Sequence, residues 1–399
     1  MSVFGLTANG LAGTLAAMTT PYLEDVFTPG HYSDPYPWYR EVRAQTPARV
    51  EGRGWVFMKH RDVGHILRNP ETFSSSGLGG PGGIGLPLIG DDPPRHGHLR
   101  RIVNRAFTPR RVAELEPWIA NAARELLDAF EPGNECDVVG GFAIPLPVRV
   151  IALLLGIPGE DYLQFKRWSD AFIGVTDAAN RELGMTAGME MAAYFANVAE
   201  ERRKTPGDDL ISALVAAEVD GEKLAPMELL GFCVLLLIAG NETTTNLISN
   251  TLGLLASRPE LWARLRADRS LVEPLIEESL RYESPVQLLM RTATRDVEMQ
   301  GSNIGEGEGV VILFGAANRD PEAFEEAETF VPERRPNNHL AFGYGIHFCL
   351  GAPLARLEAR VTLNAFLDRF SEIAPGSAAA ARTSNPIVFG YERLPLLLR

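Results

Sequence analysis

The sequence predicts a mainly α-helical fold with a minor β region. After Pro94, apolar residues recur at three- and four-residue spacing along most of the chain, which is typical of helices packed on a core. Strand-like segments are few, and they lie near both ends and in the middle of the chain. Because strands so dispersed must pair across long distances, we expect one interlocked domain over residues 21–399.

The longest predicted helix covers residues 226–257. It has no internal proline and is apolar on most sides, and at 1.5 Å per residue it would span roughly 48 Å. A helix that is apolar all round belongs in the centre of a large domain. Further helices are predicted at 37–45, 62–68, 110–130, 147–155, 162–175, 189–204 and 354–370, and strands at 50–57, within 298–314 and from 386 onward.

Composition and charge restrict the class of protein. Hydrophobic residues make up 45% and charged residues 22% of the 399 positions, which is a globular composition. The net charge of −13 argues against nucleic acid as a partner, because phosphate binding needs a basic surface. The cysteines, Cys136, Cys233 and Cys349, are too widely spaced for a disulfide framework or a zinc knuckle, so we expect a reducing compartment.

The N-terminal segment differs from the rest of the chain. Residues 1–22 carry no charged side chain and therefore lack the basic region that opens a secretory signal. We expect residues 1–20 to be an appendage outside the ordered domain. No later apolar stretch runs uninterrupted to membrane length, so the predicted location is cytoplasmic, without a membrane.

Residues 74–90 form a second unusual segment, in which glycines alternate with large apolar side chains such as Leu86. Long loops inside compact domains are uncommon and often functional. A plain linker is the alternative interpretation, but a linker would usually be polar. We therefore expect this loop to contribute to a binding pocket.

The strongest chemical signal is Phe-Gly-Tyr-Gly-Ile-His-Phe-Cys-Leu-Gly at residues 342–351. Gly343 and Gly345 permit a tight loop with positive φ. Cys349 comes just before Pro353, which suits the first turn of a helix, and a helix N-terminus favours the thiolate form of a cysteine. Thiolate is the form that binds iron. A buried structural cysteine is the alternative, but five fixed positions in ten agree with F-x-x-G-x-H-x-C-x-G.

This decapeptide resembles the haem-binding loop of the cytochrome P450 family. The resemblance extends over residues 21–399 in length, motif order and spacing. It implies the triangular-prism fold of that family and a haem b cofactor (iron protoporphyrin IX). Cys349 then corresponds to the iron ligand, with Gly351 beside it in the cofactor-binding loop.

A second motif, Ala-Gly-Asn-Glu-Thr-Thr at residues 239–244, lies in the middle of the long predicted helix. Gly240 and Thr243 are poor helix formers, and Glu242 carries a charge where burial is costly. Thr243 can bond back to the carbonyl of Ala239 and bend the helix, which opens a groove. The segment resembles the oxygen-activation motif of the family, which implies Glu242 and Thr243 as catalytic residues. A local helix defect without function is the alternative.

A third motif joins Glu278 and Arg281, which face the same way at i and i+3 on a predicted helix. An E-x-x-R match alone carries little weight, but Arg334 follows at the spacing that the family shows before the cysteine loop. The resemblance implies one network of Glu278, Arg281 and Arg334 that supports this loop. The sequence departs from the family at Arg335, where an aromatic residue is usual. The sequence therefore does not decide how the side chain at this position packs against the network.

A fourth group consists of cationic or histidine side chains. His96 and Arg100 lie at i and i+4 on a predicted helix, an arrangement that suits a pair of carboxylates. By resemblance they correspond to ligands of the haem propionates, as do Arg291 and His347. Ordinary surface charge is the alternative for each of them.

The resemblance implies a monooxygenase that inserts one oxygen atom from dioxygen into an apolar small organic substrate, as in a hydroxylation. Electrons would come from NAD(P)H through a ferredoxin reductase and an iron–sulfur ferredoxin, as in soluble bacterial members, and we expect a monomer. The expected substrate pocket is lined by Leu86, Leu236, Ala239, Leu289, Met290 and Phe389. A positive patch for an acidic ferredoxin is expected from Arg100, Arg101, Arg105, Arg110, Arg111, Arg356 and Arg360.

Three other functions compete with this interpretation. A peroxygenase driven by hydrogen peroxide is the nearest, but such family members tend to lose the acid–threonine pair that is retained here. A non-catalytic haem protein, such as a gas sensor or ligand carrier, is the second, but we see no sensor output domain in the 399 residues, which the expected fold already occupies. A helical structural protein without a cofactor would not explain the cysteine loop.

Overall fold

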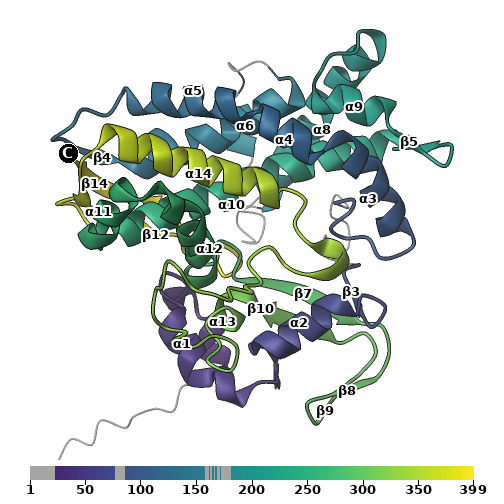
Figure 1. The fold of residues 1–399 in the computed structure, drawn as a ribbon. Coiled ribbons are helices and arrows are strands. Elements are labelled where there is room, and N and C mark those ends of the chain that lie inside the picture. Colours follow the sequence, from purple (N-terminus) through teal and green to yellow (C-terminus); the bar gives the residue numbers. More distant parts are fainter. Residues whose placement is uncertain are drawn as a thin grey trace, which may run out of the picture.

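The computed structural model describes residues 23–76, 86–157, 161, 164, 165, 167, 168, 171 and 181–399. A layer of helices lies over a smaller region built around a sheet, and the chain that leads into α14 crosses between the two (Figure 1). The expected appendage at 1–20, most of the predicted helix at 162–175 and residues 77–85 of the glycine-rich loop lie outside the described residues.

The helical layer is built around α10 (Pro226–Ala256). It contacts α6 (Pro145–Leu155), α8 (Arg181–Lys204), α12 (Val272–Tyr282) and α14 (Ala352–Arg369). Within the described part of the chain, α10 is the one helix long and apolar enough to cross a membrane. Its surroundings are those of a core helix, as the sequence predicts.

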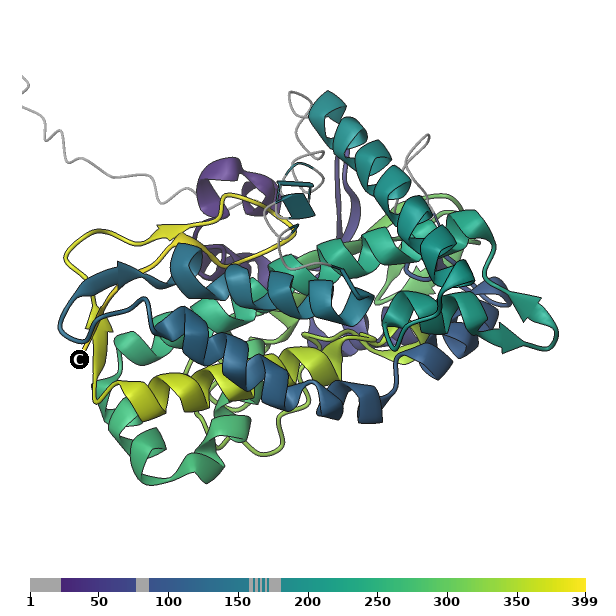
Figure 2. The same cartoon turned by 90° about the horizontal axis from the view of Figure 1, so that it is seen from above.

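The other helices surround this centre. Figure 2 shows α5 and α14 running side by side, and the two are in contact. The remaining α-helices are α1 (Tyr36–Val42), α2 (His60–Arg68), α3 (Arg95–Ala106), α4 (Pro109–Glu114), α5 (Glu116–Leu127), α9 (Leu210–Ala216), α11 (Pro259–Ala267) and α13 (Phe314–Ala317). Short helical segments are η1 (Leu23–Phe27), η2 (Pro29–His31), η3 (Arg43–Gln45), η4 (Val139–Ala143), η8 (Arg269–Leu271) and η9 (Gly345–His347).

The single helix predicted over 110–130 is wrong, because the chain forms α4 and α5 instead. Leu115 lies between them, and Pro117 is in the first turn of α5. A proline there has no N–H to donate into a preceding turn, so it starts a new helix. The apolar spacing continues across the break, and it therefore did not reveal it.

The main sheet has five strands in the order β1-β2-β10-β7-β3. The pairing of β2 with β10 is parallel and that of β10 with β7 antiparallel, so strands far apart in the sequence meet here. The bounds are β1 (Ala48–Val50), β2 (Gly54–Phe57), β10 (Gly309–Leu313), β7 (Leu288–Ala293) and β3 (Phe73–Ser74). The strand β7 was not predicted as such.

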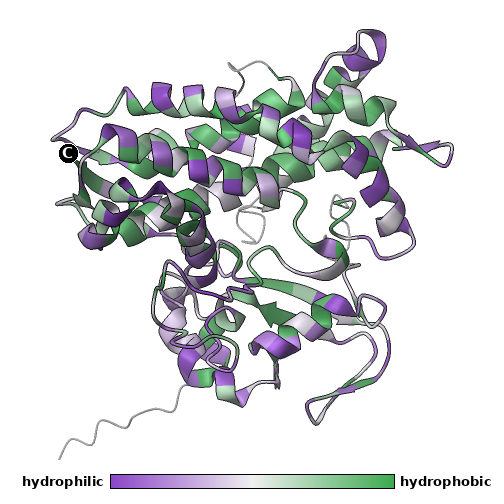
Figure 3. Cartoon of the chain, viewed as in Figure 1, coloured by the Kyte–Doolittle hydropathy of each residue, from purple (hydrophilic) through white to green (hydrophobic). Residues whose placement is uncertain are grey.

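Smaller sheets complete the β region. A three-stranded sheet joins β11 (Ile373–Pro375), β14 (Pro395–Leu398) and β4 (Glu135–Asp137). Strands β7 and β10 are mostly hydrophobic, whereas the peripheral helix α3 is mostly hydrophilic (Figure 3). Two-stranded pairs are β5 (Glu218–Val219) with β6 (Glu222–Lys223), β8 (Val297–Met299) with β9 (Ser302–Ile304), and β12 (Ala381–Arg382) with β13 (Tyr391–Arg393).

Candidate functional site

A cavity of about 250 Å³ lies between α10, β7 and the loop that precedes α14. Its wall is mostly apolar, and the loop carrying Cys349 closes one side. The residues contributed by α10 are Phe232, Leu235, Leu236, Ala239, Gly240, Thr243, Thr244 and Leu247, and those from the cysteine loop include Tyr344, His347, Cys349 and Gly351.

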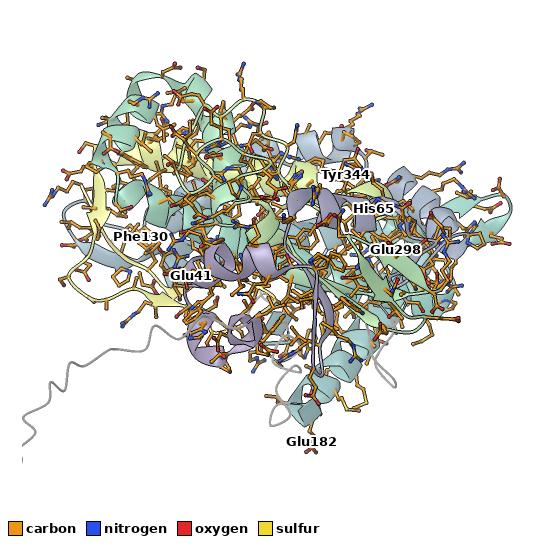
Figure 4. All side chains as sticks on the ribbon, turned by 90° about the horizontal axis from the view of Figure 1, so that it is seen from below. Glu41, His65, Phe130, Glu182, Glu298 and Tyr344 are labelled. Carbon is orange, nitrogen blue, oxygen red and sulfur yellow. The ribbon has the colours of Figure 1, made fainter. Side chains whose placement is uncertain are left out.

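The cysteine loop has the backbone geometry that its glycines predict. Gly343 and Gly345 have φ angles of +70° and +72°, which side-chain-bearing residues rarely adopt. A Cβ on Gly345 would lie 2.4 Å from the carbonyl oxygen of Leu67, so the loop presses directly on the end of α2. Figure 4 places Tyr344 of this loop close to His65 of α2, and the two segments are in contact. The glycines thus hold the loop against a rigid helix.

Cys349 lies just before α14, whose first residues include a proline. The backbone N–H of Cys349 donates to the carbonyl of Phe342 at 2.9 Å, which closes the loop. Burial raises the pKa of the Cys349 thiol, although the N–H groups of Gly351 and Ala352 and the charge of Arg100 lower it. The N–H groups at the start of α14 therefore favour the thiolate, as the sequence predicts, but burial outweighs them. A metal cation at the sulfur would shift Cys349 from thiol to thiolate, because a coordinating thiol loses its proton.

The predicted motif at residues 239–244 lies where helix α10 borders the cavity. The Thr243 hydroxyl donates to the carbonyl of Ala239 at 2.6 Å, the back-bond that the sequence predicts. Thr243 and Thr244 both line the cavity, whereas half-buried Glu242 does not and instead accepts a hydrogen bond from Asn246 at 3.4 Å. Sequence reasoning missed Thr244, because a second threonine on an apolar helix carries no signal of its own.

Arginine and histidine side chains gather at one edge of the cavity, where the described residues place the carboxylate of Asp92 nearby. Arg100, Arg291 and His347 line it, and the ring of His96 lies 4.4 Å from that of His347 between centroids. Burial lowers the pKa of Arg291 to about 10. Burial, followed by the charge of Arg291, lowers the pKa of His347 to about 3, while Asp92 opposes this shift. Asp92 is thus a nearby carboxylate that opposes the positive charge of Arg291 only in part.

The same edge holds an unsatisfied donor or acceptor. The Nε2 atom of His96 is buried and has no hydrogen-bond partner among the residues that the structure describes. Burying such an atom is costly unless something bonds to it. Two carboxylates on a flat apolar cofactor would satisfy both the excess positive charge and this nitrogen, so the residues present fit the propionates of a haem.

The predicted network around Glu278 is present in the structure. Arg281 donates two hydrogen bonds to Glu278, both at 2.8 Å, and both side chains are 0% exposed. The Nε of Arg334 lies 3.2 Å from each Glu278 oxygen. Asn337 adds a further hydrogen bond to Glu278, and Arg335 is exposed outside the network. The usual aromatic position is therefore not needed for these contacts.

The predicted substrate-pocket residues divide into two groups. Leu236, Ala239 and Leu289 line the cavity. The glycine-rich loop contributes Leu88 and Ile89, whereas Leu86 is not part of the lining and packs beside the large core cluster.

Met290 and Phe389 are wrong predictions. Alternate residues of β7 face opposite sides of the sheet, so Leu289 and Arg291 face the cavity while Met290, at 43% exposure, faces away. Phe389 packs against Tyr36, with 5.3 Å between ring centroids, in a separate core cluster.

The two faces of β7 lead to a matched prediction. Leu289→Phe should fill part of the cavity and weaken binding of an apolar ligand by about tenfold, since overpacking costs 1–3 kcal/mol. Met290→Phe adds a ring of the same size on the other face and should leave binding unchanged. Optical titration of the purified protein with a ligand that shifts its spectrum measures both, and equal effects would contradict this assignment of the faces.

The expected positive patch is largely paired with acidic side chains. Arg101 lies 3.4 Å from Asp220, and Arg110 lies 2.9 Å from Glu114. Arg356 pairs with Glu277 at 2.7 Å, and Arg360 pairs with Glu116 at 2.9 Å. The net positive charge beside Cys349 is therefore smaller than the arginine count predicts.

Comparison with known proteins gives consistent matches. The family model described as Cytochrome P450 matches residues 141–390. The putative cytochrome P450 YjiB of Bacillus subtilis is 40% identical over 367 residues, which is 90% of this chain and 92% of that protein. The cytochrome P450 monooxygenase PikC of Streptomyces venezuelae is 39% identical over 387 residues, or 92% of each chain.

Solved structures agree with the sequence matches. CYP109E1 from Bacillus megaterium in complex with testosterone has a TM-score of 0.84 at 42% identity, covering 91% of this chain and 99% of that chain. CYP109Q5 from Chondromyces apiculatus has a TM-score of 0.87 at 40% identity, covering 94% of this chain and 97% of that chain. At these identities the likeness concerns sequence as well as fold.

Proposed function

The chain belongs to the cytochrome P450 family of oxidoreductases, and on that premise we propose that it inserts one oxygen atom from dioxygen into an apolar small organic substrate. The observation that carries the proposal is that Cys349 and Thr243 of α10 line the same apolar cavity. This arrangement supports the proposal, because the sulfur that would ligate iron and a hydroxyl border the same space. The family implies haem, and we propose haem b.

Each part of the site has a separate task. A bound haem supplies the iron chemistry that activates dioxygen. The Sγ of Cys349 would coordinate that iron, and a thiolate ligand donates electron density to it. Arg100, Arg291, His96 and His347 would hold the propionates, and the apolar wall excludes water from the substrate.

Proton delivery is assigned to Thr243 and Glu242. The Thr243 hydroxyl is in the cavity and can orient a water there. Glu242 is half-buried one residue away and can pass a proton from solvent to that water. Asn246 donates a hydrogen bond to the Glu242 carboxylate at 3.4 Å, which holds that carboxylate beside the helix.

Thr243→Ala should leave haem content and ligand binding nearly unchanged, because the hydroxyl bonds within its own helix and the substitution shortens only one small side chain on the cavity wall. Product formed per NAD(P)H consumed should fall by about tenfold or more, with hydrogen peroxide released instead. Thr243→Ser keeps the hydroxyl and should retain most of the coupling. Parallel assays of NAD(P)H, hydrogen peroxide and product measure this, and full coupling in the alanine variant would refute the role of Thr243.

Electrons are proposed to come from NAD(P)H through a ferredoxin reductase and a ferredoxin. Tyr344 and Phe348 of the cysteine loop are 46% and 41% exposed, which gives a partner an apolar contact beside the site. The guanidinium of Arg68 stacks on Tyr344 at 4.5 Å, so positive charge borders the same contact. Three unpaired cysteines support a reducing, cytoplasmic location.

One assay tests the function against its nearest rival. Purified protein is incubated with testosterone, the ligand found in the CYP109E1 structure, and with a panel of other apolar compounds. A monooxygenase forms product with NAD(P)H, reductase, ferredoxin and dioxygen, and does so poorly with hydrogen peroxide alone. The reverse result would favour the peroxygenase, and haem binding without any turnover of the panel would favour a ligand-binding protein.

A further inference from the structure

The side chain of His347 is held from a part of the chain far away in sequence. The Oγ of Ser75 lies 3.0 Å from the Nε2 of His347, although the two residues are 272 positions apart. Ser75 directly follows β3 and is only 1% exposed. In the portion of the chain covered by the structure, its hydroxyl makes no other hydrogen bond. The buried hydroxyl is therefore committed to this one ring nitrogen.

Asp92 fixes the backbone at Ser75. The N–H of Ser75 donates to Oδ1 of Asp92 at 2.9 Å, and the hydroxyl of Ser74 donates to Oδ2 of the same carboxylate. The N–H of Ser76 in turn donates to the Ser74 hydroxyl at 2.9 Å. One carboxylate thus organises three consecutive serines, and it also places negative charge next to the cationic edge of the cavity.

The contact leaves one edge of the His347 ring for a ligand. His347 lines the cavity, and its Nε2 is taken by Ser75, so Nδ1 is the nitrogen that remains for a group bound there. A carboxylate at Nδ1 selects the ring form that carries hydrogen on Nδ1. The Ser75 hydroxyl rotates freely and can then give its own hydrogen to Nε2. The hydrogen bond made by one ring nitrogen decides the form of the other.

We propose that Ser75, held in place by Asp92, is a positioning residue that orients His347 so that its Nδ1–H donates to a haem propionate. The proposal rests on the proposed haem site. It links β3, the start of α3 and the cysteine loop, so that the segment before the glycine-rich loop helps to retain the cofactor. Ser75 acts only through His347 and does not itself touch the cofactor.

A double-mutant cycle tests this on the haem-loaded protein. Haem release into excess apomyoglobin is timed for the wild type, Ser75→Ala, His347→Ala and the double variant. Ser75→Ala should release haem about fivefold faster, the size expected for one buried hydrogen bond. Because Ser75 acts through His347, the double variant should release haem no faster than His347→Ala alone. Additive effects would overturn the proposal.

Controls separate positioning from general loosening. Ser279→Ala removes another buried serine hydroxyl, one that among the described residues bonds to Leu275 within α12, and should not change the release rate. Ser75→Thr keeps a hydroxyl and should restore slow release. Nitrogen-15 spectra of the reduced carbon monoxide complex should show hydrogen on Nδ1 of His347, and hydrogen on Nε2 alone would refute the assigned orientation.

The haem-release test does not depend on catalytic turnover. Haem release needs no dioxygen, reductase or substrate, so a wrong substrate class leaves the test intact. If His347→Ala holds haem as tightly as the wild type, the propionate contact and this proposal fail together, while Cys349 as iron ligand still stands. A faster release in His347→Ala with no change in Ser75→Ala would overturn the role of Ser75 alone.

Discussion

Replacing Cys349 with serine should abolish monooxygenase activity and remove the long-wavelength Soret band of the reduced carbon monoxide complex. The sulfur lies on the cavity wall in a loop fixed by two positive-φ glycines and by the bond from Cys349 N–H to Phe342. Serine preserves this backbone but is a hard, weakly acidic oxygen ligand that does not supply thiolate electron density. Difference spectra with carbon monoxide and the product assay are the two measurements.

The control for this substitution is Cys136→Ser. Cys136 is half-buried on β4 and is not among the residues lining the cavity, and burial raises the pKa of its thiol to about 11. This variant should keep both the band and the activity. A long-wavelength band that persists in Cys349→Ser would mean that another group ligates the iron, and the proposed site would then be wrong.

The site residues on helices and in the glycine-flanked loop were the most predictable from sequence. The back-bond of Thr243 and the pairing of Glu278 with Arg281 follow from fixed i, i+4 and i, i+3 geometry. The positive φ of Gly345 is a backbone conformation that glycine, unlike other residues, adopts without steric cost. Such local rules need no knowledge of the rest of the fold.

Features that depend on tertiary placement were not predictable in the same way. Met290 and Leu289 are equally apolar in sequence, and only the register of β7 against β10 decides which of them faces the cavity. The turn containing Phe389 packs on Tyr36 of α1, a contact between the two ends of the chain. Ser75 lies near the start of the glycine-rich segment and Asp92 follows it, but nothing in the sequence marks either residue as a partner of the distant His347.

The pKa of Cys349 is a third property that the sequence predicts only in part. A cysteine before a helix predicts a lowered pKa, yet burial outweighs the nearby N–H groups and Arg100 in the folded chain. The sequence indicates the sign of each contribution but not its size, because burial depends on everything packed around the loop. The same reasoning explains the positive patch, whose arginines meet acids from distant segments such as Glu277.

Replacing Glu278 with glutamine should cost about 3–5 kcal/mol of unfolding free energy, the range for removing one partner of a buried ion pair. Arg281 is 0% exposed and would keep its charge without a compensating carboxylate. Its other hydrogen bonds go to the backbone carbonyls of Asn318, Ala327 and Thr329, which cannot neutralise it. Urea unfolding of the haem-loaded protein measures the loss.

A matched control is Glu333→Gln, next to Arg334 in sequence. Glu333 pairs with Arg264, but the two side chains are 42% and 48% exposed. Exposed pairs contribute about 0–1 kcal/mol, so this variant should unfold almost like the wild type. A similar loss of unfolding free energy in both variants would show that burial is not the reason why the Glu278 pair stabilises the fold.

The Glu278 substitution should also weaken retention of the haem. Glu278 accepts hydrogen bonds from Arg334, Asn337 and the N–H of Val331, and the chain from there leads to Phe342 at the start of the cysteine loop. Leu340 N–H is fixed in the same region by the Asn318 side chain at 2.7 Å. Losing the carboxylate charge should therefore loosen the approach to Cys349, and haem should be released faster from Glu278→Gln than from Glu333→Gln. Equal release rates, despite a large loss of stability in Glu278→Gln, would mean that the network braces α12 without supporting the cysteine loop.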